Sequence, residues 1–212
     1  MAKGAATRYL SPAAGGEVSA REVAARYLAA VEEAPGQGDR LAAFRVTRKV
    51  GQDLGAFWQE VETRGWEAAL EERGLAPPAQ GPPELLAPGV SGVLAGSGGG
   101  LEEAVVRTAL ALVIRQAVQS RDRPEPAQVV RQFLATVVHL RLALDLGEPL
   151  EAAAGGYGRL RDGLDRIKAW IEAGALAAGA PSEPPATPGD WQRLAGWTWV
   201  TGVMAALLKN LG

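Results

Sequence analysis

The segment LEEAVVRTALALVIRQAVQSRDRPEPAQVVRQFLATVVHLRLALDLG (residues 101–147) contains two apolar helical patterns joined by a short charged turn. The first pattern repeats apolar residues at positions i, i+4, i+7 and i+11 of one helix face: Val106, Leu110, Val113 and Ala117. Residues 120–126 include two prolines, which stop one helix and suit the first turn of the next. Because the turn is short, we predict an antiparallel helical hairpin that ends at Gly147 in a left-handed conformation.

This hairpin is apolar enough to lie at the centre of a core. A second apolar row widens the stripe of its first helix: Val105, Leu112 and Ile114. The second helix is expected to bury a further set: Val130, Phe133, Leu134, Val137, Val138 and Leu144. Glu102 and Glu103 fall in the first turn, where carboxylates are favoured by the free backbone N–H groups. Stripes this broad are typical of helices that other helices cover.

The chain before the hairpin divides into an arm and a helical lobe. Residues 1–16 are small and polar, and we expect an irregular N-terminal arm. An N-terminal helical lobe is predicted over residues 17–74. Ser19 and Glu22 form a capping box for its first helix, because each side chain can bond the other residue's backbone N–H. Asp39 is the expected N-cap of a second, longer helix.

Glycines interrupt the pattern of that longer helix. Gly51 and Gly55 lie four residues apart, and each costs roughly 1 kcal/mol relative to alanine in a helix. Such a pair allows another part of the backbone to approach closely. Gly65 is expected to break or kink the helix.

Proline and glycine dominate residues 75–100. This composition does not sustain a long regular element, so we predict a connector with at most a short turn at residues 84–87. Connectors of this length are uncommon inside compact domains. The connector separates the N-terminal lobe from a C-terminal helical lobe over residues 101–212.

The last helix is predicted to begin near Thr187 and Pro188 and to be apolar on nearly every side. It carries three tryptophans: Trp191, Trp197 and Trp199. Such a helix must be covered all round, either by its own domain or by a partner. The simplest interpretation is a core helix, and the alternative is a partner-binding surface, since tryptophan is enriched at binding hot spots.

These patterns together predict an all-α fold. We expect six to seven helices in two bundle-like lobes around the hairpin of residues 101–147. Alternating apolar and polar runs bounded by turn residues, which would indicate strands, do not occur. No repeat of 20–50 residues is evident in the sequence.

The composition narrows the possible functions. The chain has 212 residues, a formal net charge of −2 and no cysteine. The absence of cysteine excludes disulfides, thiolate metal sites and a cysteine nucleophile. The near-neutral charge argues against a free-standing nucleic-acid-binding protein. We expect neither a membrane span nor a secretory signal, and therefore a cytoplasmic protein.

Catalytic candidates are few. His139 is the only histidine and follows Arg131 on one helix face, but no nucleophile, acid or metal-ligand set accompanies it. The spacing from Arg131 to His139 also differs from that of helical ribonucleases of the HEPN type. The glycine-rich residues 96–100 precede two glutamates, which would repel phosphate, so we interpret them as a linker. We expect no cofactor and no metal, and a solvent-facing or interface histidine.

One basic group is more suggestive. Four cationic residues lie close together at the start of the longer N-terminal helix: Arg40, Arg45, Arg48 and Lys49. Six further arginines occur along the hairpin: Arg107, Arg115, Arg121, Arg123, Arg131 and Arg141. A rigid arginine-rich face can follow a phosphate backbone. The other interpretation, which we prefer, is a solvated face with intramolecular ion pairs.

The first functional hypothesis is a non-enzymatic assembly or interaction subunit of a larger complex. Its docking surfaces would be the tryptophan helix and the central hairpin, and its partner another protein or a second copy. The alternative is a helical subunit of an RNA- or DNA-binding complex that contacts phosphate through the basic group. In being compact, all-helical and arginine-rich, the chain is similar to small helical subunits of CRISPR effector complexes, a likeness of architecture without a diagnostic motif. A helical enzyme of unknown reaction is the third hypothesis.

Overall fold

The computed structural model describes residues 2–10, 19–32, 41–75, 87–96, 98–120, 122–179 and 182–211. Within these ranges the fold is entirely helical, with ten α-helices, one short 3-10 helix and no strand. None of the helices in the described part of the chain is long and apolar enough to cross a membrane.

The elements follow in chain order: α1 (Ala2–Leu10), α2 (Ala20–Glu32), η2 (Ala42–Phe44), α3 (Arg45–Arg64), α4 (Trp66–Glu71), α5 (Ala87–Ala95), α6 (Leu101–Gln119), α7 (Pro126–Ala154), α8 (Tyr157–Ala177), α9 (Pro188–Gln192) and α10 (Leu194–Leu211).

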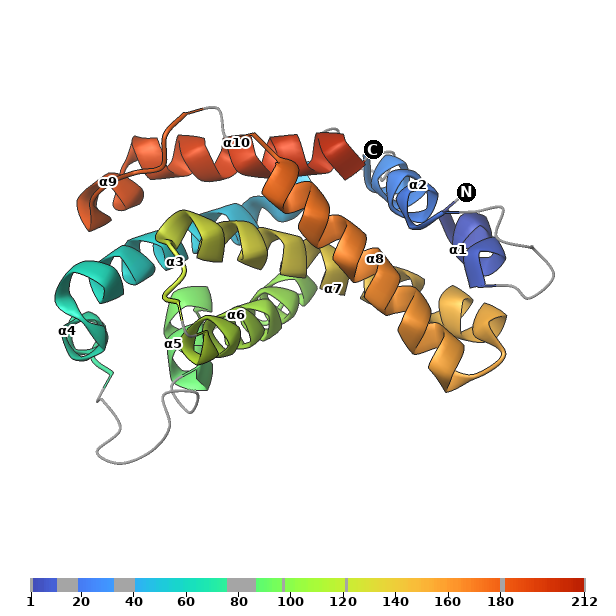
Figure 1. The fold of residues 1–212 in the computed structure, drawn as a ribbon, viewed down its shortest axis with the longest axis horizontal. Helices are drawn as coiled ribbons and strands as arrows, with labels where there is room; N and C mark the ends of the chain where they lie inside the picture. The colour runs from blue at the N-terminus through green and yellow to red at the C-terminus, as the bar shows by residue number, and fades with distance from the viewer. Residues whose placement is uncertain are drawn as a thin grey trace.

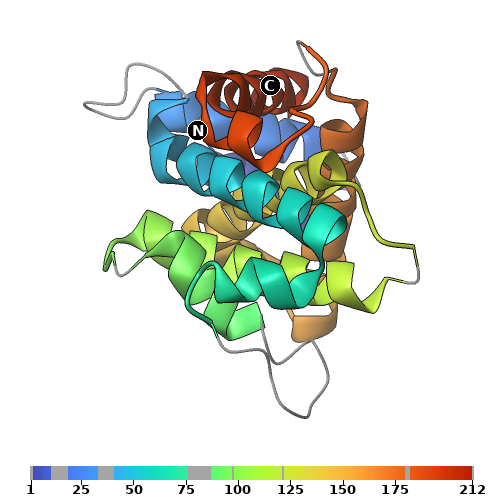
Figure 2. The same ribbon diagram turned by 90° about the vertical axis from the view of Figure 1, so that its left-hand side faces the viewer.

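Helix α7 is the centre of this arrangement, and α1, α3, α6 and α8 pack around it (Figure 1). Helices α6 and α7 run in opposite directions, as the hairpin prediction requires. Helices α9 and α10 cover α3 on one side, whereas α5 and α6 lie on its other side (Figures 1 and 2). Buried residues from all ten α-helices form one continuous cluster. The predicted all-α class is therefore confirmed, but the structure has more than six or seven helices and does not confirm two lobes.

Helix α7 is longer than its sequence suggests, so the predicted stop at Gly147 is wrong. The helix passes through both Gly147 and Pro149 and ends at Ala154, where Gly155 adopts the left-handed conformation (φ 64°). The reason is packing: every fourth residue of this part is buried, namely Leu142, Leu146, Leu150 and Ala154. Burial of this row compensates for one weak helix former and one missing backbone hydrogen bond.

The predicted irregular arm is wrong for residues 2–10, which form α1. Its buried face consists of Ala2, Ala5, Ala6 and Leu10. The small alanines allow α1 to pack closely on α7, and Leu10 lies against Gly163 of α8, where a β-carbon would come 2.4 Å from the leucine side chain. The rest of the predicted arm lies outside the described residues.

The predicted connector of residues 75–100 also contains a helix. Helix α5 begins at Ala87 with Pro88 in its first turn, a position that proline tolerates. Val90 is fully buried, and α5 packs against α6. Most of the turn expected at residues 84–87 lies outside the described residues, as does Asp39.

Local signals were more reliable at other helix ends. Ser19 Oγ accepts a hydrogen bond from the Glu22 backbone N–H (3.2 Å), as in the predicted cap of α2. Gly65 (φ 84°) separates α3 from α4. The start of α3 is stabilised from a distance, because Glu102 of α6 accepts hydrogen bonds from the Thr47 backbone N–H (2.9 Å) and hydroxyl (3.0 Å).

Candidate functional site

The tryptophans of the carboxy-terminal segment fill the layer between α3, α9 and α10. Trp191 and Trp199 are fully buried, and their rings meet edge to face with centroids 5.2 Å apart. Trp191 packs directly onto Gly55, where a β-carbon would lie 2.2 Å from the indole. The Gly51 and Gly55 pair therefore admits side chains of α9 and α10, not a second backbone.

The break between α9 and α10 differs from the single helix predicted there. The chain turns at Arg193, and the backbone of Gly196 then packs against the Trp191 carbonyl oxygen. A β-carbon at position 196 would lie only 1.9 Å from that oxygen, so the turn requires glycine there. This turn directs Trp191 and Trp199 into the core together. Trp197 is only partly buried, so it is the one tryptophan of the three that also faces the surface.

The predicted basic face is largely engaged with the chain itself. The Arg48 guanidinium lies 4.8 Å from the centre of the Trp197 ring and donates to the Thr201 hydroxyl (3.4 Å). Lys49 forms an exposed ion pair with Asp53 (2.6 Å). Arg45 is exposed and has no hydrogen-bond or ion-pair partner among the described residues, whereas Arg40 lies outside them.

Three of the hairpin arginines have structural contacts: Arg107, Arg131 and Arg141, the last of which pairs with Asp145 one turn further along α7 (3.0 Å). The Arg131 guanidinium donates to the Ala178 carbonyl (2.5 Å) at the end of α8 and lies over the ring of Trp199. Arg107 donates to the carbonyls of Gly96 (3.3 Å) and Gly98 (2.8 Å), and so holds the glycine-rich loop before α6. These contacts account for three arginines without any ligand.

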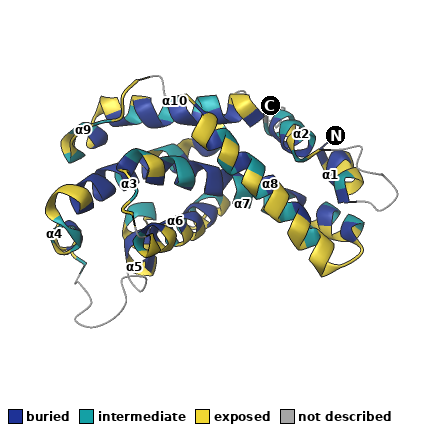
Figure 3. Ribbon diagram, viewed as in Figure 1, coloured by how far each residue is buried: buried dark blue, intermediate teal, exposed yellow. Residues whose placement is uncertain are grey.

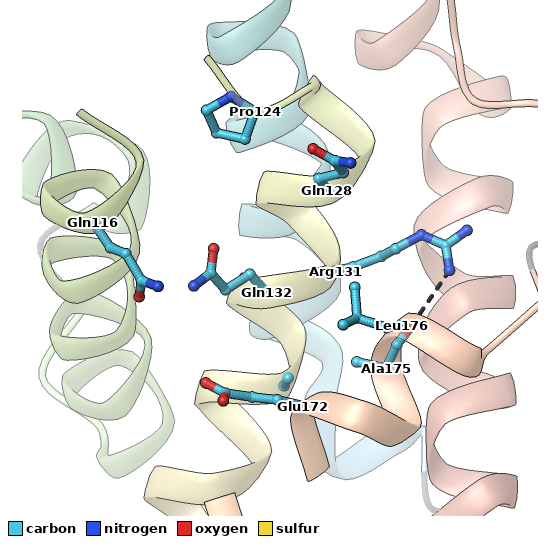
Figure 4. Close-up of a pocket in the computed structure, with 9 residues that line it drawn as sticks. Gln116, Pro124, Gln128, Arg131, Gln132, Glu172, Ala175 and Leu176 are labelled. Atoms are coloured by element: carbon cyan, nitrogen blue, oxygen red, sulfur yellow. Dashed lines mark hydrogen bonds between the residues drawn. The ribbon is translucent and has the colours of Figure 1, made fainter. Parts of the chain in front are cut away.

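One open region of the molecule is a groove between α6 and α8, with α7 as its floor (Figure 4). It consists of two adjoining hollows of about 300 Å³ and about 400 Å³, which share Gln116 and Glu172 as lining residues. In the smaller hollow, Gln116 of α6 and Gln132 of α7 point toward each other, while the Arg131 guanidinium is turned toward α10 (Figure 4). We call these two hollows the α6–α8 groove.

The larger hollow of this groove contains His139. Its ring is half-buried, and Nε2 is shielded from solvent without a hydrogen-bond partner. Burial lowers the pKa of the imidazole, and the nearby Lys168 ammonium lowers the pKa further. Arg115, Gln119 and Lys168 line the same hollow. Because Arg131 and His139 face different hollows, the structure does not bring them together as an acid–base pair.

A second open surface is the outer side of α6 and α5, which we call the α5–α6 face. Leu101 is 50% exposed, Leu112 is 36% exposed and Val93 of α5 is 45% exposed. The expectation that Leu112 belongs to the core is therefore wrong, as it is for the exposed Leu144 of α7. A hollow of about 420 Å³ lies between α5 and α6, and its charged lining residues are Arg107 and Arg115. Figure 3 shows exposed residues along the outer sides of α6 and α8.

The sequence contained one signal of the groove that composition alone does not reveal. The otherwise apolar α7 carries a polar row at positions i, i+4, i+8 and i+11: Gln128, Gln132, Thr136 and His139. A polar row on a core helix indicates a side that no other helix covers. Within the described residues, no group of three or more His, Asp or Glu side chains is arranged to hold a metal ion.

In comparisons with known proteins, no family model, no curated protein and no solved structure matches the chain. A proposal for its function therefore rests on the geometry described above.

Proposed function

We propose that the protein is a non-enzymatic assembly subunit that associates with a second copy of itself through the α5–α6 face. The observation that carries this proposal is the exposed row of α6, which is uncharged until Arg115: Leu101, Ala104, Thr108 and Leu112. A helix that is apolar on its inner face and uncharged on its outer face is typical of one covered on both sides. The exposed Val93 extends this surface onto α5.

The row is complementary to itself when two α6 helices pack in antiparallel directions about Thr108. In this register, Leu112 of one copy lies opposite the small Ala104 of the other, at both ends of the contact. The arrangement pairs the same patch on both subunits, as a two-fold interface requires. The two Arg115 side chains fall at opposite ends of the contact, so that their guanidinium groups do not repel each other. A parallel arrangement would place the two guanidinium groups next to each other.

Light scattering and sedimentation over a wide concentration range test this proposal. We expect the wild-type chain to dimerise reversibly, and Thr108→Arg to be monomeric because it places two like charges at the two-fold axis. The matched control is Leu194→Arg, which introduces the same charge at an exposed leucine of α10. A monomeric wild type at all concentrations, or a Thr108→Arg variant that still dimerises, would contradict the proposal.

A second candidate function is nucleic-acid binding through only two residues of the predicted basic group. Arg45 and Lys49 lie one turn apart and are both exposed, so they can reach a phosphate backbone without losing the contacts of Arg48. Salt-dependent RNA or DNA binding that weakens in the Arg45→Gln, Lys49→Gln variant supports it. Binding that is unchanged in this variant but lost in Arg159→Gln, Arg161→Gln on α8, or no binding at low salt, would exclude this face.

A further inference from the structure

We propose that the larger hollow of the α6–α8 groove binds a small organic anion, specifically the phosphate monoester of a polyhydroxylated, sugar-sized molecule. The phosphate would lie between Arg115 of α6 and Lys168 of α8, next to His139 of α7. The hydroxyl-bearing body would extend along the glutamines toward the smaller hollow. This inference goes beyond the assembly role and does not rest on it.

The charges in the hollow favour an anion. Arg115 is exposed and has no ion-pair partner among the described residues. Lys168 lies on the opposite wall, and its ammonium is 3.6 Å from Glu172, a long and half-exposed contact. Lys168 lines the same hollow as His139, and its charge lowers the pKa of the imidazole, whereas the charge of Asp165 raises it. With His139 neutral, the two cations outnumber the single lining carboxylate.

The polar groups around these charges lack partners inside the chain. His139 Nε2 is buried without a hydrogen bond, although buried polar atoms normally have one. The amides of Gln116, Gln119 and Gln132 have no protein partner within the described ranges, and each offers both donors and an acceptor. The glutamine amides suit hydroxyls and phosphate oxygens, whereas His139 Nε2 is itself shielded from solvent.

The size and lining of the groove narrow the ligand class. The two hollows, of about 400 Å³ and about 300 Å³, are in the range of small-molecule sites. Among the described residues, neither hollow is lined by phenylalanine, tyrosine or tryptophan, so apart from the His139 imidazole the groove offers no ring for base stacking. A sugar phosphate is therefore a better match than a strand of nucleic acid.

Because His139 is the only histidine, its imidazole signal in a proton NMR titration reports on this hollow alone. We expect glucose 6-phosphate to raise the measured pKa of His139 in a saturable manner, since a bound negative charge stabilises the imidazolium. Inorganic phosphate should do the same at higher concentration, and glucose should not. Sodium chloride at matched ionic strength is the control for screening.

Two variants make the test specific. Lys168→Gln and Arg115→Gln should each weaken the binding of glucose 6-phosphate about tenfold or more, since each removes a charge-assisted contact. Lys209→Gln on α10 and Arg159→Gln on α8 are the matched controls and should bind as the wild type. A His139 pKa that does not respond to glucose 6-phosphate, or an equal response in Lys168→Gln, would overturn the proposal. A response only to an oligoribonucleotide would overturn it in favour of a nucleic-acid ligand.

Discussion

The layer formed by α3, α9 and α10 and the groove between α6 and α8 both contain ring nitrogens without a hydrogen-bond partner, but their surroundings differ. In the layer, two indoles are fully buried and Arg48 lies on a third tryptophan ring. In this layer the indole Nε1–H groups of Trp191 and Trp199 are buried without a hydrogen-bond acceptor. In the groove, His139 Nε2 is likewise unpaired and shielded from solvent, but other polar groups of the same hollow, such as Gln119, are exposed. A buried unpaired nitrogen therefore does not indicate a site by itself, whereas exposed polar groups around a hollow can.

The largest effect expected within this comparison is the loss of Trp191. Trp191→Ala should destabilise the fold by about 3–5 kcal/mol, because it leaves a cavity beside Gly55 that the surroundings cannot fill. Trp197→Ala, in the same segment but partly exposed, should cost less than half of that. Urea unfolding of both variants measures the difference. Equal costs would mean that the layer is not packed as described.

The contact between Gly55 and Trp191 should also decide whether Gly55→Ala stabilises or destabilises the fold. Gly55→Ala in the wild type should destabilise by about 1–3 kcal/mol, because its β-carbon overlaps the indole. In the Trp191→Ala background the same change should stabilise by up to about 1 kcal/mol, the helix propensity of alanine over glycine. A double-mutant cycle measures this coupling. Additive effects would show that the two residues do not touch.

A third prediction concerns the link from α6 to the start of α3. Glu102→Gln should cost about 1–2 kcal/mol, because the carboxylate accepts the Thr47 backbone N–H near the positive end of the helix. Glu103→Gln is the control, since its side chain is not hydrogen-bonded to another residue in the described part of the chain. Chemical denaturation of the two variants tests the difference, and an equal cost for both would remove the capping role.

The smallest expected effect is a change in pH dependence from the groove. Burial lowers the pKa of His139 in the folded chain, so the folded state holds the proton less tightly than the unfolded state does. The stability from neutral His139 is therefore present above pH about 6.5 and is lost as the pH falls below it. His139→Leu should lack this acid-side loss. Unfolding curves on both sides of this pH show whether the two proteins diverge.

The sequence was informative where structure depends on neighbours along the chain. The apolar rows of α6 and α7, apart from the exposed Leu112 and Leu144, follow from local patterns, as do the cap at Ser19 and the break at Gly65. Helix α1 was missed because alanine, although a good helix former, does not mark a buried face as clearly as a large apolar side chain does. Helix α5 was missed because proline and glycine, which disfavour helix, lie within its first six residues. They form because α7 and α6 bury them, and that contact is not visible in a local window. The same explanation holds for α7 beyond Gly147.

The candidate sites depend even more on distant contacts. The cluster of Arg45, Arg48 and Lys49 is visible in the sequence, but its internal partners Trp197 and Thr201 come from more than a hundred residues away. The α6–α8 groove is formed by three helices that are distant in sequence. In the sequence alone His139 therefore appears isolated, whereas in the fold it shares a hollow with Arg115 and Lys168. Only the polar row on α7 could have drawn attention to that side.

The position of α1 has a consequence for the order of events during synthesis. This helix leaves the ribosome before α8, yet its Tyr9 hydroxyl donates to the Gly163 carbonyl (3.4 Å) and its Leu10 rests on the same glycine. Its docking site is therefore complete only after Gly163 of α8 has been translated. We infer that α1 waits as an unanchored segment and joins the fold after the helices between it and α8 have been made.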